Sequence, residues 1–97
     1  MIESPSIPLH YRIMQGQENI VSDMDGETVM MNIANGNYYN LGKLGGRIWD
    51  LIGTPITIAE LVNTLVSEYE VEQSVCEEQV NTFLLRLSEE RLIHFGE

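Results

Sequence analysis

The dipeptide Asn35-Gly36, set between two runs of strand character, constrains the fold of this chain more than any other feature. Asparagine and glycine tolerate the positive φ angles that both central positions of a type I′ turn require. Before the dipeptide, Glu27–Ile33 alternates its side chains between two faces, and after it Tyr38–Leu41 forms a short strand that Gly42 ends. The pattern predicts a β-hairpin with a tight turn.

A third strand precedes this hairpin. Asn19–Met24 contains β-branched residues, and Asp25-Gly26 follows it as a turn signal. We therefore expect an antiparallel meander of three strands. A further strand over Leu9–Met14 is weakly indicated, so we divide the chain into an N-terminal segment, residues 1–18, and a domain, residues 19–97.

Helical periodicity replaces strand alternation after Gly42. Leu44–Ile52 places its apolar residues on one face, and Gly53 with Pro55 ends this first helix. Glycine disfavours a helix, so Gly45-Gly46 indicates either a frayed first turn or a close approach of another part of the backbone.

Two further helices each begin with the pattern of a capping box. Thr57–Glu60 opens a helix whose apolar stripe runs to Tyr69, and Ser74–Glu77 opens another that continues to about Glu90. Leu92–Phe95 completes the chain as a short extended tail. The expected fold is α+β, with a three-stranded antiparallel sheet followed by three helices.

The charge balance excludes several classes of function. The 97 residues include 15 Asp and Glu but 5 Lys and Arg, which gives a net charge of −10. So acidic a chain repels phosphate backbones, and we expect no nucleic-acid partner.

The sequence contains no apolar run of about 18 residues, the length that crosses a membrane, and its first residues do not form a secretory signal. The single Cys76 cannot form an intramolecular disulfide, which is typical of the cytoplasm.

Few residues could carry catalysis. His10 and His94 lie near opposite ends of the sequence and do not form a metal-ligand spacing. Cys76 begins the third helix, but the neighbouring Glu77 and Glu78 oppose a thiolate there. The glycines of 42–46 match no phosphate-binding loop. We therefore expect no metal, no cofactor and no enzymatic activity.

The last strand of the meander, Asn37–Leu41, has an outer edge with no partner nearby in the sequence. Proteins usually protect such an edge with charge, proline or a bulge, yet residues 36–42 carry no charge. An open edge of this kind can accept an extended peptide as an added strand. The alternatives are that the N-terminal segment covers the edge or that two copies of the chain pair through it.

Leu85 is a second indication of a binding surface. On the third helix it points about 140° away from the core stripe centred on Val80. The residue is either a scattered surface leucine or the contact of a second apolar neighbour, such as a docked peptide. The strand edge and Leu85 together suggest a groove between strand and helix.

The chain resembles the PqqD-like family over about residues 19–95. The resemblance rests on three segments. The first is an aromatic strand, Asn37-Tyr38-Tyr39-Asn40-Leu41, that runs into a helix containing Gly46-Arg47-Ile48-Trp49-Asp50-Leu51-Ile52. The others are a capped helix that begins Thr57-Ile58-Ala59-Glu60-Leu61 and a closing apolar segment from Val80 to Leu92-Ile93. These segments are most similar to those of the stand-alone lasso-peptide type.

The resemblance implies a small winged helix-turn-helix-like domain that binds the leader of a ribosomally made precursor peptide. In the family the leader adds as a strand beside the third strand and packs on the third helix. Carried over by position, the peptide-binding residues would be Asn37, Tyr38, Tyr39, Asn40, Leu41, Cys76, Glu77, Val80, Asn81, Leu84 and Leu85. The expected partners are the leader peptide and a separate leader peptidase or other maturation enzyme.

Two other functions compete with this hypothesis. A winged-helix DNA-binding regulator shares the topology but needs a basic recognition helix, whereas the third helix carries one arginine and several glutamates. A small hydrolase or redox protein would need an unusually reactive Cys76. The acidic surface instead favours a leader that carries lysines.

Overall fold

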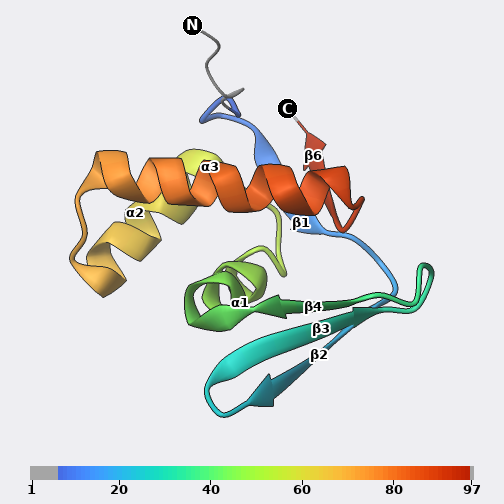
Figure 1. The fold of residues 1–97 in the computed structure, drawn as a ribbon. Helices are drawn as coiled ribbons and strands as arrows, with labels where there is room; N and C mark the ends of the chain where they lie inside the picture. The colour runs from blue at the N-terminus through green and yellow to red at the C-terminus, as the bar shows by residue number, and fades with distance from the viewer. Residues whose placement is uncertain (1–6, 97) are drawn as a thin grey trace, which may run out of the picture.

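The computed structural model describes residues 7–96, which form two small antiparallel sheets and three helices (Figure 1). The elements, in chain order, are β1 Arg12–Gln15, β2 Asn19–Met24, β3 Glu27–Asn32, β4 Tyr38–Leu41, α1 Gly42–Leu51, β5 Ile56–Thr57, α2 Ile58–Tyr69, α3 Gln73–Glu89 and β6 Ile93–Gly96. The fold is α+β, as the sequence predicts. No helix in residues 7–96 is long and apolar enough to cross a membrane.

The predicted meander is confirmed as the sheet β2-β3-β4. Met30 pairs with Val21 on one side and with Tyr39 on the other, and its side chain is fully buried beneath the helices. Alternation therefore directs one face of β3 into the core and the other face away from it.

The two turns of the meander differ from expectation. Asp25 and Gly26, with φ of 55° and 82°, form the two-residue turn with both φ angles positive, and Met24 pairs with Glu27 across it. The prediction of a type I′ turn at Asn35-Gly36 is wrong, because only Gly36 has a positive φ there.

Asn32 explains the longer loop before β4. Its buried side-chain oxygen accepts a hydrogen bond from the Asn35 amide at 2.9 Å, and its carbonyl accepts one from the Gly36 amide at 2.9 Å. The register that results, Met31 opposite Tyr38, is shifted by two residues from that of a two-residue turn. An even shift preserves which face each side chain occupies.

The second sheet has the order β5-β1-β6 and joins the two ends of the described chain. Ile13 of β1 lies opposite Phe95 of β6, and its side chain is fully buried. The weakly indicated N-terminal strand is therefore present, but it lies outside the meander. Within residues 7–96, no strand covers the free edge of β4.

The helices pack closely on the meander. A Cβ on Gly46 of α1 would collide with the side chain of Thr28 in β3, and a Cβ on Gly45 would lie 2.8 Å from the ring of Phe83 in α3. Other parts of the chain therefore approach this glycine pair closely, but they do so with side chains and not with backbone.

Of the two predicted capping boxes, one is present and one is not. In α2, Thr57 Oγ1 accepts from the Glu60 amide at 3.1 Å while Glu60 Oε1 accepts from the Thr57 amide at 3.1 Å, as predicted. The prediction of a capping box at Ser74 is wrong, because α3 begins at Gln73, two residues before the start that a cap at Ser74 requires, and its N-cap residue Glu72 makes no side-chain cap hydrogen bond. The Gln73 amide group instead donates to Glu77 Oε2 at 3.0 Å.

Candidate functional site

The free edge of β4 exposes backbone hydrogen-bonding groups to solvent. The Asn32 amide donates to the Asn37 carbonyl at 3.0 Å, which fixes the phase of the ladder between β3 and β4. Because ladder bonds alternate along an antiparallel pair, Tyr39 directs its backbone groups toward β3, while Tyr38 and Asn40 direct theirs outward. The Asn37 carbonyl also points toward β3, but the Asn37 amide donates to Asn35 Oδ1 at 2.8 Å. The edge therefore offers two donors and two acceptors at strand spacing.

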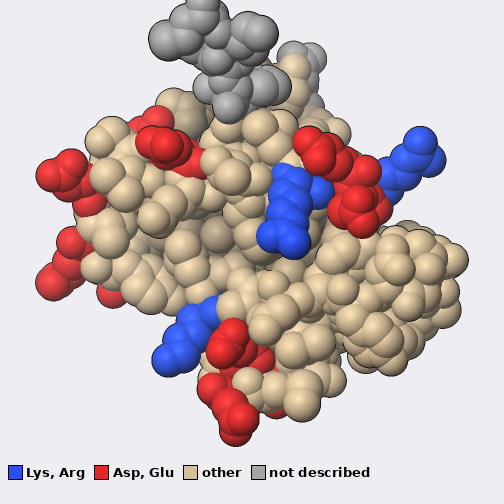
Figure 2. All heavy atoms as spheres, in the orientation of Figure 1, with Lys and Arg blue, Asp and Glu red and all other residues tan. Residues whose placement is uncertain are grey.

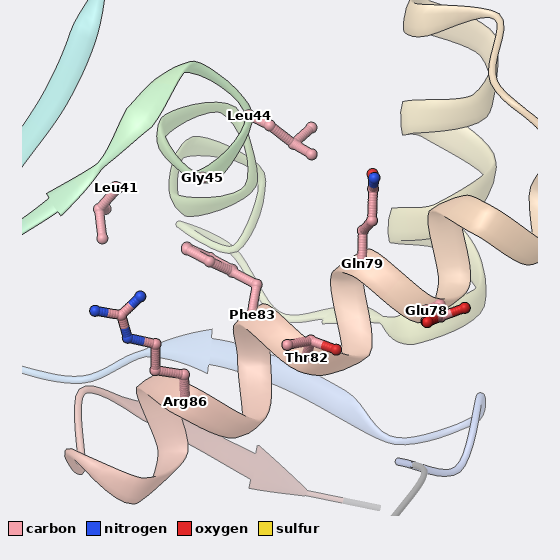
Figure 3. Close-up of a pocket in the computed structure, with 8 residues that line it drawn as sticks. All are labelled: Leu41, Leu44, Gly45, Glu78, Gln79, Thr82, Phe83 and Arg86. Atoms are coloured by element: carbon pink, nitrogen blue, oxygen red, sulfur yellow. The ribbon is translucent and has the colours of Figure 1, made fainter. Parts of the chain in front are cut away.

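A groove of about 450 Å³ lies between α3 and the junction of β4 with α1 (Figure 3). We call it the β4–α3 groove. Its lining comes from the end of β4, the first turn of α1 and one face of α3, and consists of Leu41, Leu44, Gly45, Glu78, Gln79, Thr82, Phe83 and Arg86.

The floor of the β4–α3 groove is apolar. Figure 3 shows Phe83 of α3 reaching toward Leu41 and Gly45, with Leu44 on the far side of the same hollow. The missing side chain at Gly45 leaves room for the Phe83 ring, since a Cβ there would lie 2.8 Å from it. This glycine therefore shapes the floor in addition to positioning the helix.

Polar groups stand along the α3 side of the groove. Arg86 lies at one end and Glu78 at the other, with Gln79 and Thr82 between them. Figure 2 shows a largely uncharged hollow on this face, with acidic side chains in separate groups around it and basic side chains at only a few points. The groove is therefore apolar at its centre and charged at its margins.

Two predicted edge residues use their side chains within the fold. The Tyr39 hydroxyl donates to Glu90 Oε1 at 3.0 Å, and Asn40 Oδ1 accepts from the Gly42 amide at 2.9 Å, at the entry to α1. Tyr38, in contrast, exposes 72% of its surface. A bound peptide would thus meet the backbone of Asn40 and both the backbone and side chain of Tyr38.

The α3 residues predicted to bind the peptide lie outside the β4–α3 groove. Val80 and Leu84 are fully buried and Cys76 is 4% exposed, so all three belong to the core. Asn81 Oδ1 accepts from the Ile7 amide at 2.9 Å. Leu85 and Glu77 are half-buried and, like the other four, are not among the residues that line the β4–α3 groove.

The α3 residues that line the groove were missed for an identifiable reason. The apolar stripe of α3 is centred on Val80 and identifies the side of the helix that faces the core. Such a stripe alone does not show that the helix has a second apolar neighbour on one flank. Phe83 carried a signal, because it sits at the margin of that stripe beside the polar Gln79 and Arg86. The close packing of the Phe83 ring over Gly45 joins residues distant in the sequence, so no local pattern indicates it.

Cys76 is poorly suited to nucleophilic chemistry. Burial, and secondarily the charge of Glu77, raises the pKa of the Cys76 thiol. A catalytic thiol needs the opposite shift. No group of three His, Cys, Asp or Glu side chains within residues 7–96 is arranged to hold a metal ion.

An uncharged, unpaired strand edge beside an apolar groove defines a class of small domains that can take up an extended peptide. The family described as coenzyme PQQ synthesis protein D (PqqD) matches residues 27–93, and the chain belongs to this family. No curated protein sequence matches the chain.

Two solved structures share the fold. TbiB1 in complex with the TbiA(beta) leader peptide is 26% identical and has a TM-score of 0.73, covering 84% of this chain and 94% of its own. Lasso peptide synthetase B1 complexed with the leader peptide is 23% identical, also with a TM-score of 0.73, covering 84% of this chain and 96% of its own.

Proposed function

We propose that this protein is a non-catalytic adaptor that binds the leader of a ribosomally made precursor peptide, of the lasso-peptide type, and presents it to a separate maturation enzyme. The observation that carries the proposal is the uncharged free edge of β4 beside the apolar β4–α3 groove. Membership of the PqqD family and the likeness to TbiB1, which was solved with a leader peptide, support it.

The leader binds as an added strand. Its backbone pairs with the outward groups of Tyr38 and Asn40, which fixes its register but selects little sequence. A disordered leader loses conformational entropy on docking, so the hydrogen bonds must be supplemented by apolar anchors.

The groove supplies those anchors. Alternate side chains of a strand point to one face, and those of a leader beside β4 would enter the hollow above Leu41, Leu44 and Phe83. We propose this floor, with Gln79, Thr82 and Arg86 of α3, as the helical side of the site. The strand side is Asn37–Leu41, as the sequence predicts.

Charge selects among leaders. The chain carries a net charge of −10, while the groove centre is uncharged, so the acidic surroundings attract a leader that carries lysines without blocking the apolar floor. Because this attraction acts between exposed charges, it should weaken as salt is added.

Nothing favours DNA binding by α3. The helix contains three glutamates and one arginine, and Arg86 lines the groove. The free, buried Cys76 supports a cytoplasmic location, where we place the adaptor.

Titration of the synthetic leader against matched variants tests the proposal. Phe83→Ala and Leu85→Ala remove half-buried side chains from one helix at positions about 160° apart around it, so only the first should weaken binding, by about tenfold. Gln79→Trp, at an exposed position, should block the groove without disturbing the core.

The urea midpoint of each variant separates loss of folding from loss of binding. No binding of the unaltered chain at tens of micromolar leader would exclude the proposed function. Weakening by Leu85→Ala alone would move the site to another face of α3.

A further inference from the structure

Among residues 7–96, Arg86 is the one basic side chain that lines the β4–α3 groove. Figure 3 shows this side chain rising from α3 toward Leu41, at the end of the groove away from Gln79. Arg86 is exposed, and it makes no hydrogen bond or ion pair with any other described residue. The groove therefore presents a guanidinium group whose donors have no partner in residues 7–96.

This lack of a partner contrasts with the acidity of the chain, which carries 15 Asp and Glu against 5 Lys and Arg. On α1, Arg47 donates from Nε and from a terminal nitrogen to the two carboxylate oxygens of Glu68, at 2.9 and 2.6 Å. Glu90 lies four residues after Arg86, within reach of a helical side-chain pair, but its Oε1 accepts from the Tyr39 hydroxyl at 3.0 Å instead. Arg86 thus remains available to a carboxylate from another molecule.

The geometry relates each position of β4 to a level of α3. The Tyr39 hydroxyl reaches Glu90 at the end of α3, while Gly45, further along the chain, lies against the ring of Phe83. The strand and the helix therefore run in opposite directions, as Figure 1 shows. Arg86 lies between these two levels, about one helical turn before Glu90.

Alternation decides which side chains of an added strand meet α3. Tyr39 and Leu41 pack against the core, so they lie on the face of β4 toward the helices. Side chains directly opposite one another across an antiparallel pair share a face. The leader residue opposite Leu41 would therefore lie above Phe83, and the one opposite Tyr39 would lie beside Arg86.

The direction of the leader fixes the order of these two residues. The sheet β2-β3-β4 is antiparallel throughout, and antiparallel pairing is the more stable kind per residue. A leader that continues this pattern meets Leu41 first and Tyr39 two residues later. The residue above Phe83 is the apolar anchor, and the side chain two residues after it reaches Arg86.

The two ends of the groove differ in charge. At one end, the Arg86 guanidinium can donate two parallel hydrogen bonds to a carboxylate, and the apolar floor beside it reduces screening by salt. At the other end, Glu78 stands eight residues earlier in α3, which corresponds to about 12 Å along the helix. Strand positions two before and two after the anchor are about 13 Å apart, so an acidic side chain before the anchor would be repelled by Glu78.

We infer that Arg86 is a specificity-determining residue that binds an aspartate or glutamate of the leader, two residues after the apolar anchor. The inference rests on the proposed function and names the side chains that the groove selects. Because the chain as a whole carries a charge of −10, acidic peptides are disfavoured over the rest of the surface. A leader that slips by two residues along β4 loses the pair with Arg86, so this pair fixes the register that backbone hydrogen bonds leave open.

The test is a double-mutant cycle between Arg86 and the synthetic leader. The anchor is the apolar leader residue whose replacement by alanine weakens binding to the unaltered chain but not to Phe83→Ala. One leader carries Glu two residues after this anchor, a second carries Gln there, and a third carries Glu two residues before the anchor and Gln after it.

Each leader is titrated against the unaltered chain, Arg86→Gln and the control Arg91→Gln. Arg91→Gln removes the same charge from an exposed position outside the groove. Arg86→Gln should weaken binding of the first leader by about fivefold and of the second by less than about twofold. Arg91→Gln should affect both leaders equally, and the third leader should bind the unaltered chain more weakly than the other two.

The other outcomes overturn the inference. Equal weakening of the first two leaders by Arg86→Gln would mean that Arg86 acts by packing and not through a carboxylate. The same discrimination by Arg91→Gln would assign the effect to the charge of the whole protein. Tightest binding of the third leader would overturn the order of anchor and carboxylate. In these three cases the leader still binds, so the adaptor function stands; failure of the unaltered chain to bind any leader would overturn both.

Discussion

The Tyr39 hydroxyl donates a hydrogen bond to Glu90 Oε1 at 3.0 Å and so joins β4 to the C-terminal end of α3. The same hydroxyl accepts from Asn35 Nδ2 at 3.0 Å, which adds the hairpin loop to the connection. Since α3 forms one side of the β4–α3 groove and β4 ends at the other, this phenol helps to set the distance between the two sides.

Tyr39→Phe should therefore loosen the groove without emptying the core. We expect a loss of about 1 kcal/mol in the free energy of unfolding, measured with urea, because one hydrogen-bonding hydroxyl is removed. Leader affinity should fall by about threefold as the two sides become less preorganised. Tyr69→Phe is the control, because Tyr69 lies on α2, exposes 46% of its surface and does not line the groove. Equal effects of the two variants would contradict this role for Tyr39.

Gly46→Ala should destabilise the protein even though alanine favours a helix. A Cβ at this position collides with the side chain of Thr28, and the packed sheet beneath cannot move away freely. The expected cost is about 1–3 kcal/mol in the free energy of unfolding. Gly96→Ala, where no atom of residues 7–96 other than those of its chain neighbours lies within 4 Å of the added Cβ, should cost much less. Equal losses would contradict the close packing of α1 on β3.

The capping box of α2 should make stability depend on pH in the acid range. Hydrogen bonds from the Thr57 amide and hydroxyl lower the pKa of Glu60 in the folded chain. The stabilisation is therefore complete above the unfolded pKa and is lost as the pH falls through the folded pKa.

Glu60→Gln keeps an acceptor at this position but does not titrate. The urea midpoint of this variant should decline less between pH 7 and pH 3 than that of the unaltered chain. An identical decline would show that the cap makes no contribution to acid unfolding.

Cys76 should react slowly with thiol reagents while the protein is folded. Burial raises the pKa of its thiol, and its Sγ lies 4.0 Å from the Val62 carbonyl oxygen within the core. Labelling at pH 7 should accelerate strongly in urea, where the thiol becomes exposed. Labelling of the native protein faster than that of a free cysteine would instead favour chemistry at this residue.

Local patterns were sufficient to predict most of the elements. Strand alternation before Gly42, helical periodicity after it and the capping box at Thr57 each depend on residues close together in the chain, and each is confirmed. The turn at Asn35-Gly36 was not predictable in this way, because the side chain of Asn32 organises a longer loop.

Contacts distant in the sequence account for the remaining differences. β1 pairs with β6 at the other end of the chain, and the local signal for a strand at Leu9–Met14 is only weak. The α3 side of the groove depends on where α1 lies, which Gly45 and Gly46 decide through contacts with Phe83 and Thr28. A helical stripe alone therefore located the core side of α3 but not the side that lines the groove.

Strand addition at β4 is tested most directly by amide hydrogen exchange with and without the leader. The account predicts that the amides of Tyr38 and Asn40, which point to the free edge, become protected when the leader binds. The Tyr39 amide, which points toward β3, serves as the internal control and should change little. Binding of the leader with unchanged exchange at both Tyr38 and Asn40 would contradict the account.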